Sequence, residues 1–492
     1  MTRIGFCLAG LVALLLSPGP ARADRCSELV AALSKHIVAD SAVCFESSDL
    51  TTNNSVTTPL DNSLSGWPTF AFTPITDRGV ISPSVPDHTP ITKAVPGLQL
   101  EAYLAGDATG EARFLLRLPD GWNGKLVVAG ASGTRSEFNG DFAWSDYLVQ
   151  KGYAYASQNK GIMNLELVGV FDAPPASDPL ACRLNPSSTV WVHFYDDDPE
   201  KPFTGWQERI VQAAWIAREG VKAWYGREAY RTYAVGTSNG GYQVRRAIEE
   251  APELFDGGVD WEGTFVDPSA NNVLAYLPAA VASFPAYAAS GFDPNSAAAK
   301  AIRSAGYPPD LVQGGVSLWD LYNEEFWEVT ACQWQKRLDP TYDTYGAGLD
   351  HYDYLARTRV SEVAENLEAF ATTGRIKKPL VTVAGTMDAL LPIVHQARAY
   401  AAAVARSRRG FDPRREPPYR LYEVQNGNHI ESYAATFPQL QILQPHAQRA
   451  FDLLVEHVEH GAELPPDQCV PLGGRISSSP EEPGRCAELF AP

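Results

Sequence analysis

A serine in a glycine-rich turn is the first residue of this chain whose setting predicts chemistry. Ser238 lies in the pentapeptide GTSNG (236–240), which follows an alternating β-branched and aromatic run and precedes a Gly- and Pro-free stretch over 242–251. This succession predicts a strand, a tight turn and a helix, with the serine at the corner. A side chain at Gly236 or Gly240 would collide with the neighbouring strand or helix. We therefore interpret Ser238 as a nucleophile that the turn holds outward.

A base and an acid for this serine follow two later strand-like runs. A serine hydroxyl is a weak nucleophile at neutral pH and needs a base that is itself oriented by an acid. Asp388 follows the run PLVTVAG, and His429 follows the next run, YRLYEV, after a Gly-containing loop. The chain order Ser238, Asp388, His429 is that of a nucleophile-elbow hydrolase. Asp260, at the end of an earlier strand, is the alternative acid.

Backbone amides near the serine complete the predicted site. A tetrahedral intermediate needs N–H donors aimed at its negative oxygen. We expect one donor from Asn239, directly after the nucleophile, and the second from Ala131 or Ser132, in the Gly-flanked loop after the run KLVVAG. An ordinary tight turn is the alternative interpretation of that loop. Chemistry of this kind needs no cofactor and no metal.

Two acidic groups raise the question of a metal site. The first is a run of three aspartates at 196–198, and the second comprises Asp339, Asp343, Asp350 and Asp353. Neither has the spacing of an EF-hand loop. We interpret the first group as a solvated acidic face, and structural calcium remains an alternative for the second.

The elements that must position these residues are strands alternating with helices. We count eight strand-like segments, most of the later ones separated by helical stretches, which predicts an α/β protein with a mostly parallel sheet and helices on both faces. In such a sheet the ligands gather beyond the carboxyl ends of the strands. The segments are LQLEAYLA, EARFLLRLP, KLVVA, GYAYAS, YRTYAVG, GGVDW, PLVTVAG and YRLYEV.

The predicted core is interrupted by one long insertion. Residues 264–378 are too long for a loop and read as short helices rich in alanine and aromatics, which we expect to cover the sheet edge as a lid. Most of its rings should pack in its own core rather than face a substrate. The remaining boundaries are a signal peptide at 1–23, an N-terminal extension at 24–95, the hydrolase core at 96–263 and 379–463, and a C-terminal tail at 464–492.

The N-terminus and the cysteines predict export. A basic start, an apolar run over 4–16 and the A-x-A sequence ending at Ala23 are typical of a secretory signal peptide, because the run is too short to span a membrane. Cleavage after Ala23 would leave six of the seven cysteines, an even number that favours three disulfides. Fifteen connectivities are open, and local closure favours Cys26 with Cys44 and Cys469 with Cys486, which leaves Cys182 for Cys332.

Charge narrows the range of partners. The chain has a formal net charge of −18, and it becomes more acidic once two arginines leave with the signal peptide. Such a surface repels a phosphate backbone, so we expect no nucleic-acid partner. No later apolar run has the length of a membrane span. The setting expected from the signal peptide and the cysteines is secreted or periplasmic.

From about residue 98 to 461 the chain resembles the α/β-hydrolase superfamily, and within it the tannase and feruloyl esterase family. The resemblance is carried by RFLLRLPDGWNGKLVVAGASG, KGYAYASQNKG, VKAWYGREAY and the elbow followed by PELFDGGVDWEG. That family has cysteines directly before the serine and after the histidine, where this chain has Thr237 and Ile430. The GTSNGG elbow is also similar to that of hydrolases of 3-hydroxybutyrate oligomers.

The resemblance implies a secreted serine esterase that acts through an acyl-enzyme, with tannin-type or feruloyl-type esters as substrates. Oligomers of hydroxyalkanoates are the alternative substrate. A non-catalytic binding protein that retains the fold is the alternative from another class.

Overall fold

The computed structural model describes residues 23–57, 89–107, 110–133, 136–161, 166–176, 178–193, 203–410 and 417–492. The signal peptide predicted over 1–23 lies outside these residues except for Ala23, and so do the aspartates at 196–198. In the described part of the chain, no helix combines the length and apolar character needed to cross a membrane.

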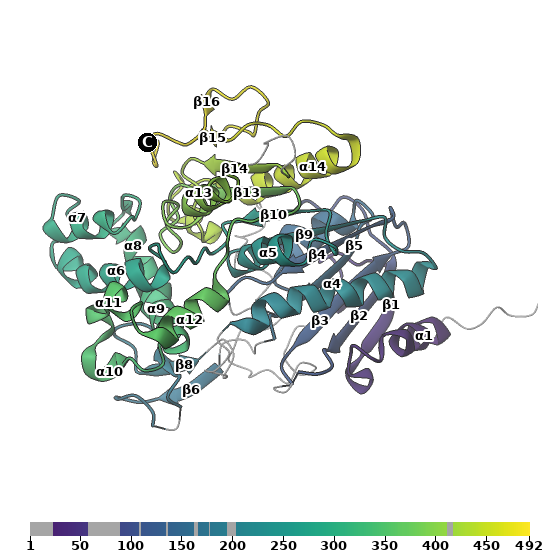
Figure 1. Cartoon of the computed structure of the whole chain (residues 1–492), viewed down its shortest axis with the longest axis horizontal. Coiled ribbons are helices and arrows are strands. Elements are labelled where there is room, and N and C mark those ends of the chain that lie inside the picture. The colour runs from purple at the N-terminus through teal and green to yellow at the C-terminus, as the bar shows by residue number, and fades with distance from the viewer. Residues whose placement is uncertain are drawn as a thin grey trace, which may run out of the picture.

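One large sheet organises the molecule (Figure 1). Its central strands run parallel to their neighbours, on both sides of the strand that leads to Ser238. The first three strands of the chain form an antiparallel edge. All eight strands expected from the sequence are present, in a mostly parallel arrangement. In spatial order the strands are β1 (Val43–Ser47), β2 (Gly97–Tyr103), β3 (Arg113–Pro119), β5 (Ala154–Gln158), β4 (Lys125–Gly130), β9 (Arg231–Thr237), β10 (Gly257–Trp261), β13 (Leu380–Gly385), β14 (Tyr419–Val424), β15 (Gln468–Val470) and β16 (Glu482–Pro483).

The described sheet is larger than expected because three short strands extend its edges. β1 pairs with β2, and β15 and β16 continue the sheet beyond β14. The N-terminal extension and the C-terminal tail therefore each contribute to the main sheet. These strands have two to five residues, which is too short for a repeating hydrophobic pattern to stand out.

Helices cover both faces of the sheet. Alternate residues of each strand enter opposite cores, as Val128 and Val127 do in β4. One face packs against α1 (Ala23–Leu33), α4 (Thr204–Tyr225), α5 (Asn239–Glu250) and α13 (Ala397–Ser407). The other packs against α14 (Gln444–His460), α3 (Asp146–Val149) and the π-helical turn Asp141–Ser145 before it. This arrangement gives the layered α/β architecture expected from the sequence.

The insertion between β10 and β13 forms a helical body beside the sheet (Figure 1). Its aromatic rings pack mainly on one another in a separate core that includes Trp319, Trp327 and Trp334. Its elements are α6 (Val273–Ala289), α7 (Ala297–Ser304), β11 (Val312–Gln313), β12 (Val316–Ser317), α8 (Leu318–Tyr322), α9 (Glu328–Leu338), α10 (Thr344–Ala347), α11 (Tyr354–Arg357) and α12 (Ser361–Phe370).

A second, smaller excursion of the chain joins this body. β6 (Glu166–Val170), β7 (Cys182–Arg183) and β8 (Val190–His193) form a three-stranded sheet of their own. A disulfide between Cys182 in β7 and Cys332 in α9 connects the two. The other two disulfides, Cys26–Cys44 and Cys469–Cys486, are the local pairs that the spacing favoured.

Candidate active site

Ser238 lies on a strained corner between β9 and α5. Its backbone has φ 57° and ψ −122°, a conformation that an L-residue adopts at a cost of about 1–3 kcal/mol. The Ser238 N–H donates a 2.9 Å hydrogen bond to the carbonyl of Trp261 in β10. The turn is therefore anchored to the neighbouring strand.

The glycines flanking this corner are required by close backbone contacts. A Cβ atom on Gly236 would lie 2.3 Å from the carbonyl oxygen of Gly240. One on Gly240 would lie 2.5 Å from the carbonyl oxygen of Gly130, at the end of β4. The collisions expected from the pentapeptide are thus present, and they bring the start of α5 against the loop after β4.

Ser238, His429 and Asp388 form a continuous hydrogen-bonded series. Nε2 of His429 lies 3.1 Å from Oγ of Ser238, and Nδ1 lies 2.8 Å from Oδ2 of Asp388. The three residues are 7%, 5% and 2% exposed, respectively. A serine, a base and an acid at these separations match the geometry of a Ser-His-Asp triad.

Asp388 is held as an oriented carboxylate. Its Oδ1 accepts hydrogen bonds of 2.8 and 2.7 Å from the N–H groups of Leu390 and Leu391. Its Oδ2 is thereby directed at Nδ1 of His429, which must carry the proton because a carboxylate only accepts. In the neutral imidazole the lone pair on Nε2 is then available to the Ser238 hydroxyl.

Opposing effects set the basicity of His429. Burial lowers its pKa, because a charged imidazolium loses its hydration. The charge of Asp388 and the hydrogen bond to it, followed by smaller effects of the neighbouring Glu262 and Glu431, outweigh burial and raise the pKa of His429 to about 9. The site therefore favours the protonated base strongly.

Glu262 is a site residue that the sequence reasoning missed. It directly follows β10, and its Oε2 lies 3.5 Å from Nδ1 of His429. Its Oε1 accepts a 3.1 Å hydrogen bond from the Gly385 N–H, whereas Oε2 has no hydrogen-bond partner within the described residues. Burial, and then the charge of Asp388, raise its pKa well above the ordinary range. Its place at a strand end was the signal that could have identified it.

Asp260, the alternative acid, has a different set of partners. Its Oδ2 accepts hydrogen bonds from Arg245 Nε (2.6 Å) and Thr382 Oγ1 (2.8 Å). Its Oδ1 accepts a 2.7 Å bond from the Gly263 N–H. Asp260 is therefore a buried ion-pair partner of α5, and the contact with His429 belongs to Asp388.

The three predicted oxyanion donors differ in whether their N–H groups already donate a hydrogen bond. The Asn239 N–H is the first amide of α5, which a helix leaves without an acceptor of its own. The Ala131 N–H donates to Gln243 Oε1 at 3.0 Å, and the Ser132 N–H donates to Asn139 Oδ1 at 3.1 Å. Both loop amides are buried and thus need partners, which the side chains of Gln243 and Asn139 supply.

A buried lysine holds the same loop from its carbonyl side. Nζ of Lys160, fully buried, donates to the carbonyl oxygens of Ala131 (2.9 Å) and Ser132 (3.1 Å). Lys160 adopts φ 64° just after β5. Nothing in the local sequence marks this lysine as a partner of residues about 30 positions earlier.

The inserted body contacts the loops that carry the acid and the base. Trp327 Nε1 donates a 2.7 Å hydrogen bond to the carbonyl of Ala389, next to Asp388. The Tyr322 hydroxyl donates a 2.9 Å bond to Oδ1 of Asn428, next to His429. The insertion therefore contacts the loops beside Asp388 and His429, and its role as a lid stays a prediction.

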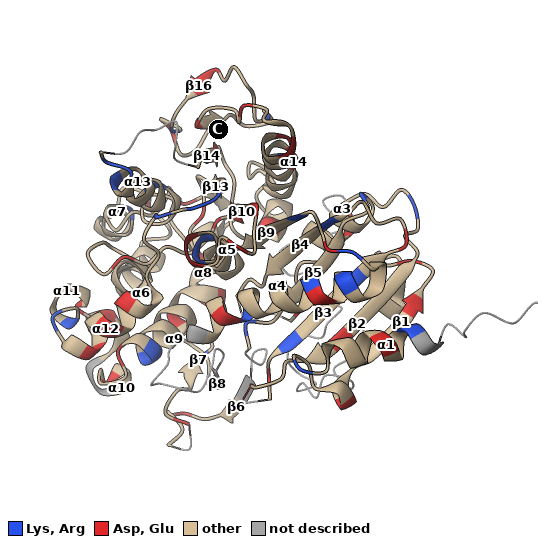
Figure 2. Ribbon diagram, turned by 45° about the vertical axis from the view of Figure 1, so that its right-hand side comes forward, with Lys and Arg blue, Asp and Glu red and all other residues tan. Residues whose placement is uncertain are grey.

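The acidic group in the insertion does not assemble a metal site in the described structure. Asp339 is bound by Arg357, with Nη2 at 2.6 Å from its Oδ1, and Asp353 caps the start of α11. Figure 2 accordingly shows basic positions beside the acidic ones around α10 to α12. Within the described ranges, the one set of three potential ligands is Glu262, Asp388 and His429, whose atoms lie within 4.8 Å of one another.

Comparison with solved structures identifies the class of fold. Tannin acyl hydrolase from Aspergillus niger superposes with a TM-score of 0.54 at 12% sequence identity, over 89% of this chain and 88% of that one. The chain thus has the α/β-hydrolase fold. The buried residues Thr237 and Ile430 stand beside Ser238 and His429, and the three disulfides lie elsewhere.

Sequence comparisons find similarity to one family over part of the chain. Residues 333–483, which include Asp388 and His429, match the family model 3HB-oligomer hydrolase (3HBOH). The D-(-)-3-hydroxybutyrate oligomer hydrolases of Burkholderia vietnamiensis and Burkholderia thailandensis are 31% and 29% identical over 126 and 125 residues. These matches cover 24% of this chain and 17% of either relative, so the chain spans a minor part of each.

Proposed function

We propose that this protein is a serine esterase that hydrolyses carboxylic esters through an acyl-enzyme. The observation that carries the proposal is the hydrogen-bonded series of three side chains in an α/β-hydrolase fold. His429 lies 3.1 Å from the hydroxyl of Ser238, on its strained corner, and 2.8 Å from the carboxylate of Asp388. In this proposal Ser238 is the nucleophile, His429 the base and Asp388 the acid that orients it.

The reaction follows from the hydrogen bonds of these side chains. Nε2 of His429 takes the hydroxyl proton as Oγ of Ser238 attacks the ester carbonyl. The Asn239 N–H stabilises the negative oxygen that develops, and the loop at 130–133 supplies the second donor when substrate displaces one of its side-chain acceptors. His429 returns the proton to the leaving alcohol. Water, activated by the same base, then hydrolyses the acyl-enzyme.

The favoured substrates are oligomers of 3-hydroxybutyrate or related hydroxyalkanoates. The family match at 333–483 includes the acid, the base and part of the inserted body, so it covers residues that would contact a substrate. Tannin-type and feruloyl-type esters, expected first from the sequence, are the second candidate. Their support is the likeness of several core segments, because the fold shared with tannin acyl hydrolase carries no substrate information.

We further propose that the protein acts outside the cytoplasm. Three disulfides form in the described residues, and such bonds persist in oxidising compartments. The predicted signal peptide with cleavage after Ala23 would deliver the chain there. N-terminal sequencing of the protein from culture medium or periplasm tests this, and an intact N-terminus on the exported protein would contradict the cleavage site.

An ester panel tests the function and separates the substrates. The panel contains p-nitrophenyl acetate, linear 3-hydroxybutyrate dimers and trimers, methyl gallate and methyl ferulate, assayed with the wild type, Ser238→Ala and the surface control Ser34→Ala. We expect turnover by the wild type and Ser34→Ala, highest kcat/KM on the hydroxybutyrate trimer, and a loss of at least about 10³-fold in Ser238→Ala. Undiminished turnover in Ser238→Ala would overturn the proposal. A wild type inert to every ester would favour a binding protein.

A further inference from the structure

A second carboxyl group stands at the imidazole of the base. Glu262 follows β10, the strand between the one that leads to Ser238 and the one that leads to Asp388. Its backbone N–H donates a 2.8 Å hydrogen bond to the carbonyl of Val383, so its main chain continues the sheet. Its φ of 53° is a strained value for a non-glycine residue. Because of this φ, the side chain does not lie on the face that strand alternation would give it, and it points toward His429 instead.

The position of this carboxyl group matches a role at Nδ1. Glu262 is 3% exposed, and its Oε2, without a hydrogen-bond partner in the described structure, lies 3.5 Å from Nδ1 of His429. Asp388 holds the same nitrogen at 2.8 Å. A buried carboxyl oxygen without a hydrogen-bond partner is costly, so its place next to a base calls for a functional reason.

The two carboxyl groups are not equivalent in charge. Asp388 accepts two backbone N–H bonds in addition to the imidazole, whereas Glu262 accepts one, from Gly385. Two carboxylates this close cannot both ionise cheaply, so the less stabilised one retains a proton. Glu262 is that residue, and its neutral carboxyl leaves Asp388 as the working partner of His429.

We propose that Glu262 is a second positioning residue for His429, placed to accept the Nδ1 hydrogen bond in place of Asp388. When Asp388 is absent, Glu262 releases its proton to solvent and its Oε2 becomes the acceptor of Nδ1–H. Nε2 then keeps its lone pair for the Ser238 hydroxyl. The inference rests on the proposed function, because it assigns Glu262 to the same base.

A double-mutant cycle tests this on p-nitrophenyl acetate, with folding of each variant checked by circular dichroism. We expect kcat to fall about threefold in Glu262→Gln, about 100-fold in Asp388→Ala, and about 10⁴-fold in the double variant, level with His429→Ala. Asp388→Ala/Glu262→Asp is the matched control: it keeps the charge but withdraws it by one methylene, and it should fall as far as the double variant. Equal activities of Asp388→Ala and Asp388→Ala/Glu262→Gln would overturn the proposal.

The pKa of His429 provides a readout that a purely structural role would not move. The charged or titratable groups that act on this imidazole are Asp388, Glu262 and Glu431. In a Ser238→Ala background, ¹⁵N-histidine NMR should give a pKa that decreases from the parent to Asp388→Asn and again to Asp388→Asn/Glu262→Gln. The Asn variant keeps an oxygen for the Leu390 and Leu391 amides, so it preserves the loop if Asp388→Ala fails to fold.

The same titration separates failure of this inference from failure of the proposed function, since it needs no turnover. Identical pKa values with and without Glu262 in the Asp388→Asn background would contradict the inference even in an active esterase. Stoichiometric metal in the purified protein, measured by plasma mass spectrometry and lost in Glu262→Gln, would also overturn it, because the three side chains would then be ligands.

Discussion

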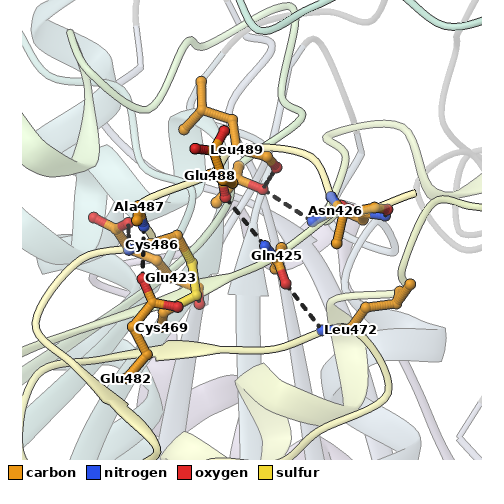
Figure 3. Close-up of a disulfide and its surroundings, with 12 residues drawn as sticks. Glu423, Gln425, Asn426, Cys469, Leu472, Glu482, Cys486, Ala487, Glu488 and Leu489 are labelled. Atoms are coloured by element: carbon orange, nitrogen blue, oxygen red, sulfur yellow. Dashed lines mark hydrogen bonds between the residues drawn. A yellow bond between two sulfur atoms is a disulfide. The ribbon is translucent and has the colours of Figure 1, made fainter.

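The side chain of Asn426 exchanges two hydrogen bonds with the backbone of Ala491. Its Nδ2 donates to the Ala491 carbonyl at 2.6 Å, and its Oδ1 accepts from the Ala491 N–H at 2.7 Å. Figure 3 shows the surrounding tail, where Gln425 bonds Glu488 and a disulfide joins Cys469 to Cys486. The C-terminal tail is thereby connected to the loop that carries His429, three residues beyond Asn426.

Replacement of Asn426 should make the loop that carries His429 less stable and the position of His429 less fixed. Asn426 has φ 61°, which asparagine tolerates better than alanine does. We expect Asn426→Ala to lower the free energy of unfolding by about 2–3 kcal/mol, from lost hydrogen bonds and strain together, and kcat by about tenfold. Asn426→Gly also removes the side-chain hydrogen bonds, but glycine adopts a positive φ without strain, so this variant should lose less stability. Chemical denaturation and ester assays measure both quantities.

The matched control for this prediction is Asn123→Ala. Asn123 also bonds the backbone through its side chain, but it lies just before β4, at the opposite end of the strand from the site. Its replacement should leave kcat within about twofold of wild type. An equal loss of kcat in both variants would show that Asn426 has no particular connection to the base.

Activity should depend on the ionisation of His429. A general base acts in its neutral form, and the pKa of His429 is raised to about 9. The value of kcat/KM should therefore rise through neutral pH and reach half its maximum at about pH 9, after subtraction of the Ser238→Ala background. A plateau already reached at pH 7 would contradict the raised pKa.

Replacing each of the two candidate acids should affect a different property: stability for Asp260 and catalysis for Asp388. Asp260 and Arg245 form a fully buried ion pair with a 2.6 Å contact. Asp260→Asn leaves the Arg245 charge without its partner, and we expect a loss of about 3–5 kcal/mol of stability. The folded fraction should keep kcat within about threefold, whereas Asp388→Asn should lower kcat in a folded protein. Urea denaturation with parallel assays distinguishes them, and a loss of kcat without a loss of stability in Asp260→Asn would reverse the assignment.

The disulfide between β7 and α9 should stabilise the inserted body. Cys182 and Cys332 are separated by 150 residues, and closing so long a loop restricts the unfolded chain strongly, by about 4–5 kcal/mol in the entropic model. Cys182→Ala/Cys332→Ala should therefore be cleaved faster by trypsin within 264–378. Cys26→Ala/Cys44→Ala, which opens an 18-residue separation at the sheet edge, is the control. Equal cleavage of the insertion in both variants would contradict this role.

Much of the sheet and the triad geometry could be predicted because both depend on local signals. Each of the eight central strands is a buried apolar or alternating run, and Ser238, Asp388 and His429 each follow such a run. The carboxyl ends of parallel strands share one sheet edge, so the strand-end positions, together with the chain order, indicated that the three would meet. Their distances bear out that expectation, and the catalytic roles stay predictions.

Features that depend on tertiary contacts could not be predicted from the sequence. The strand-end position of Glu262 was visible, but its side-chain direction was not: strand periodicity places it on the same face as Asp260, and its positive φ overrides that pattern. The amides of Ala131 and Ser132 are bonded by Gln243 and Asn139. Such partners become adjacent only when the sheet and helices have packed.

Covalent trapping of the nucleophile tests the central claim most directly. The wild type and Ser238→Ala are treated with a fluorophosphonate, and intact mass followed by peptide mapping locates the adduct. We predict one adduct per wild-type chain, at Ser238, with parallel loss of esterase activity and no adduct in Ser238→Ala. Unlabelled Ser238 in a protein that still hydrolyses esters, or labelling at another residue, would contradict the account.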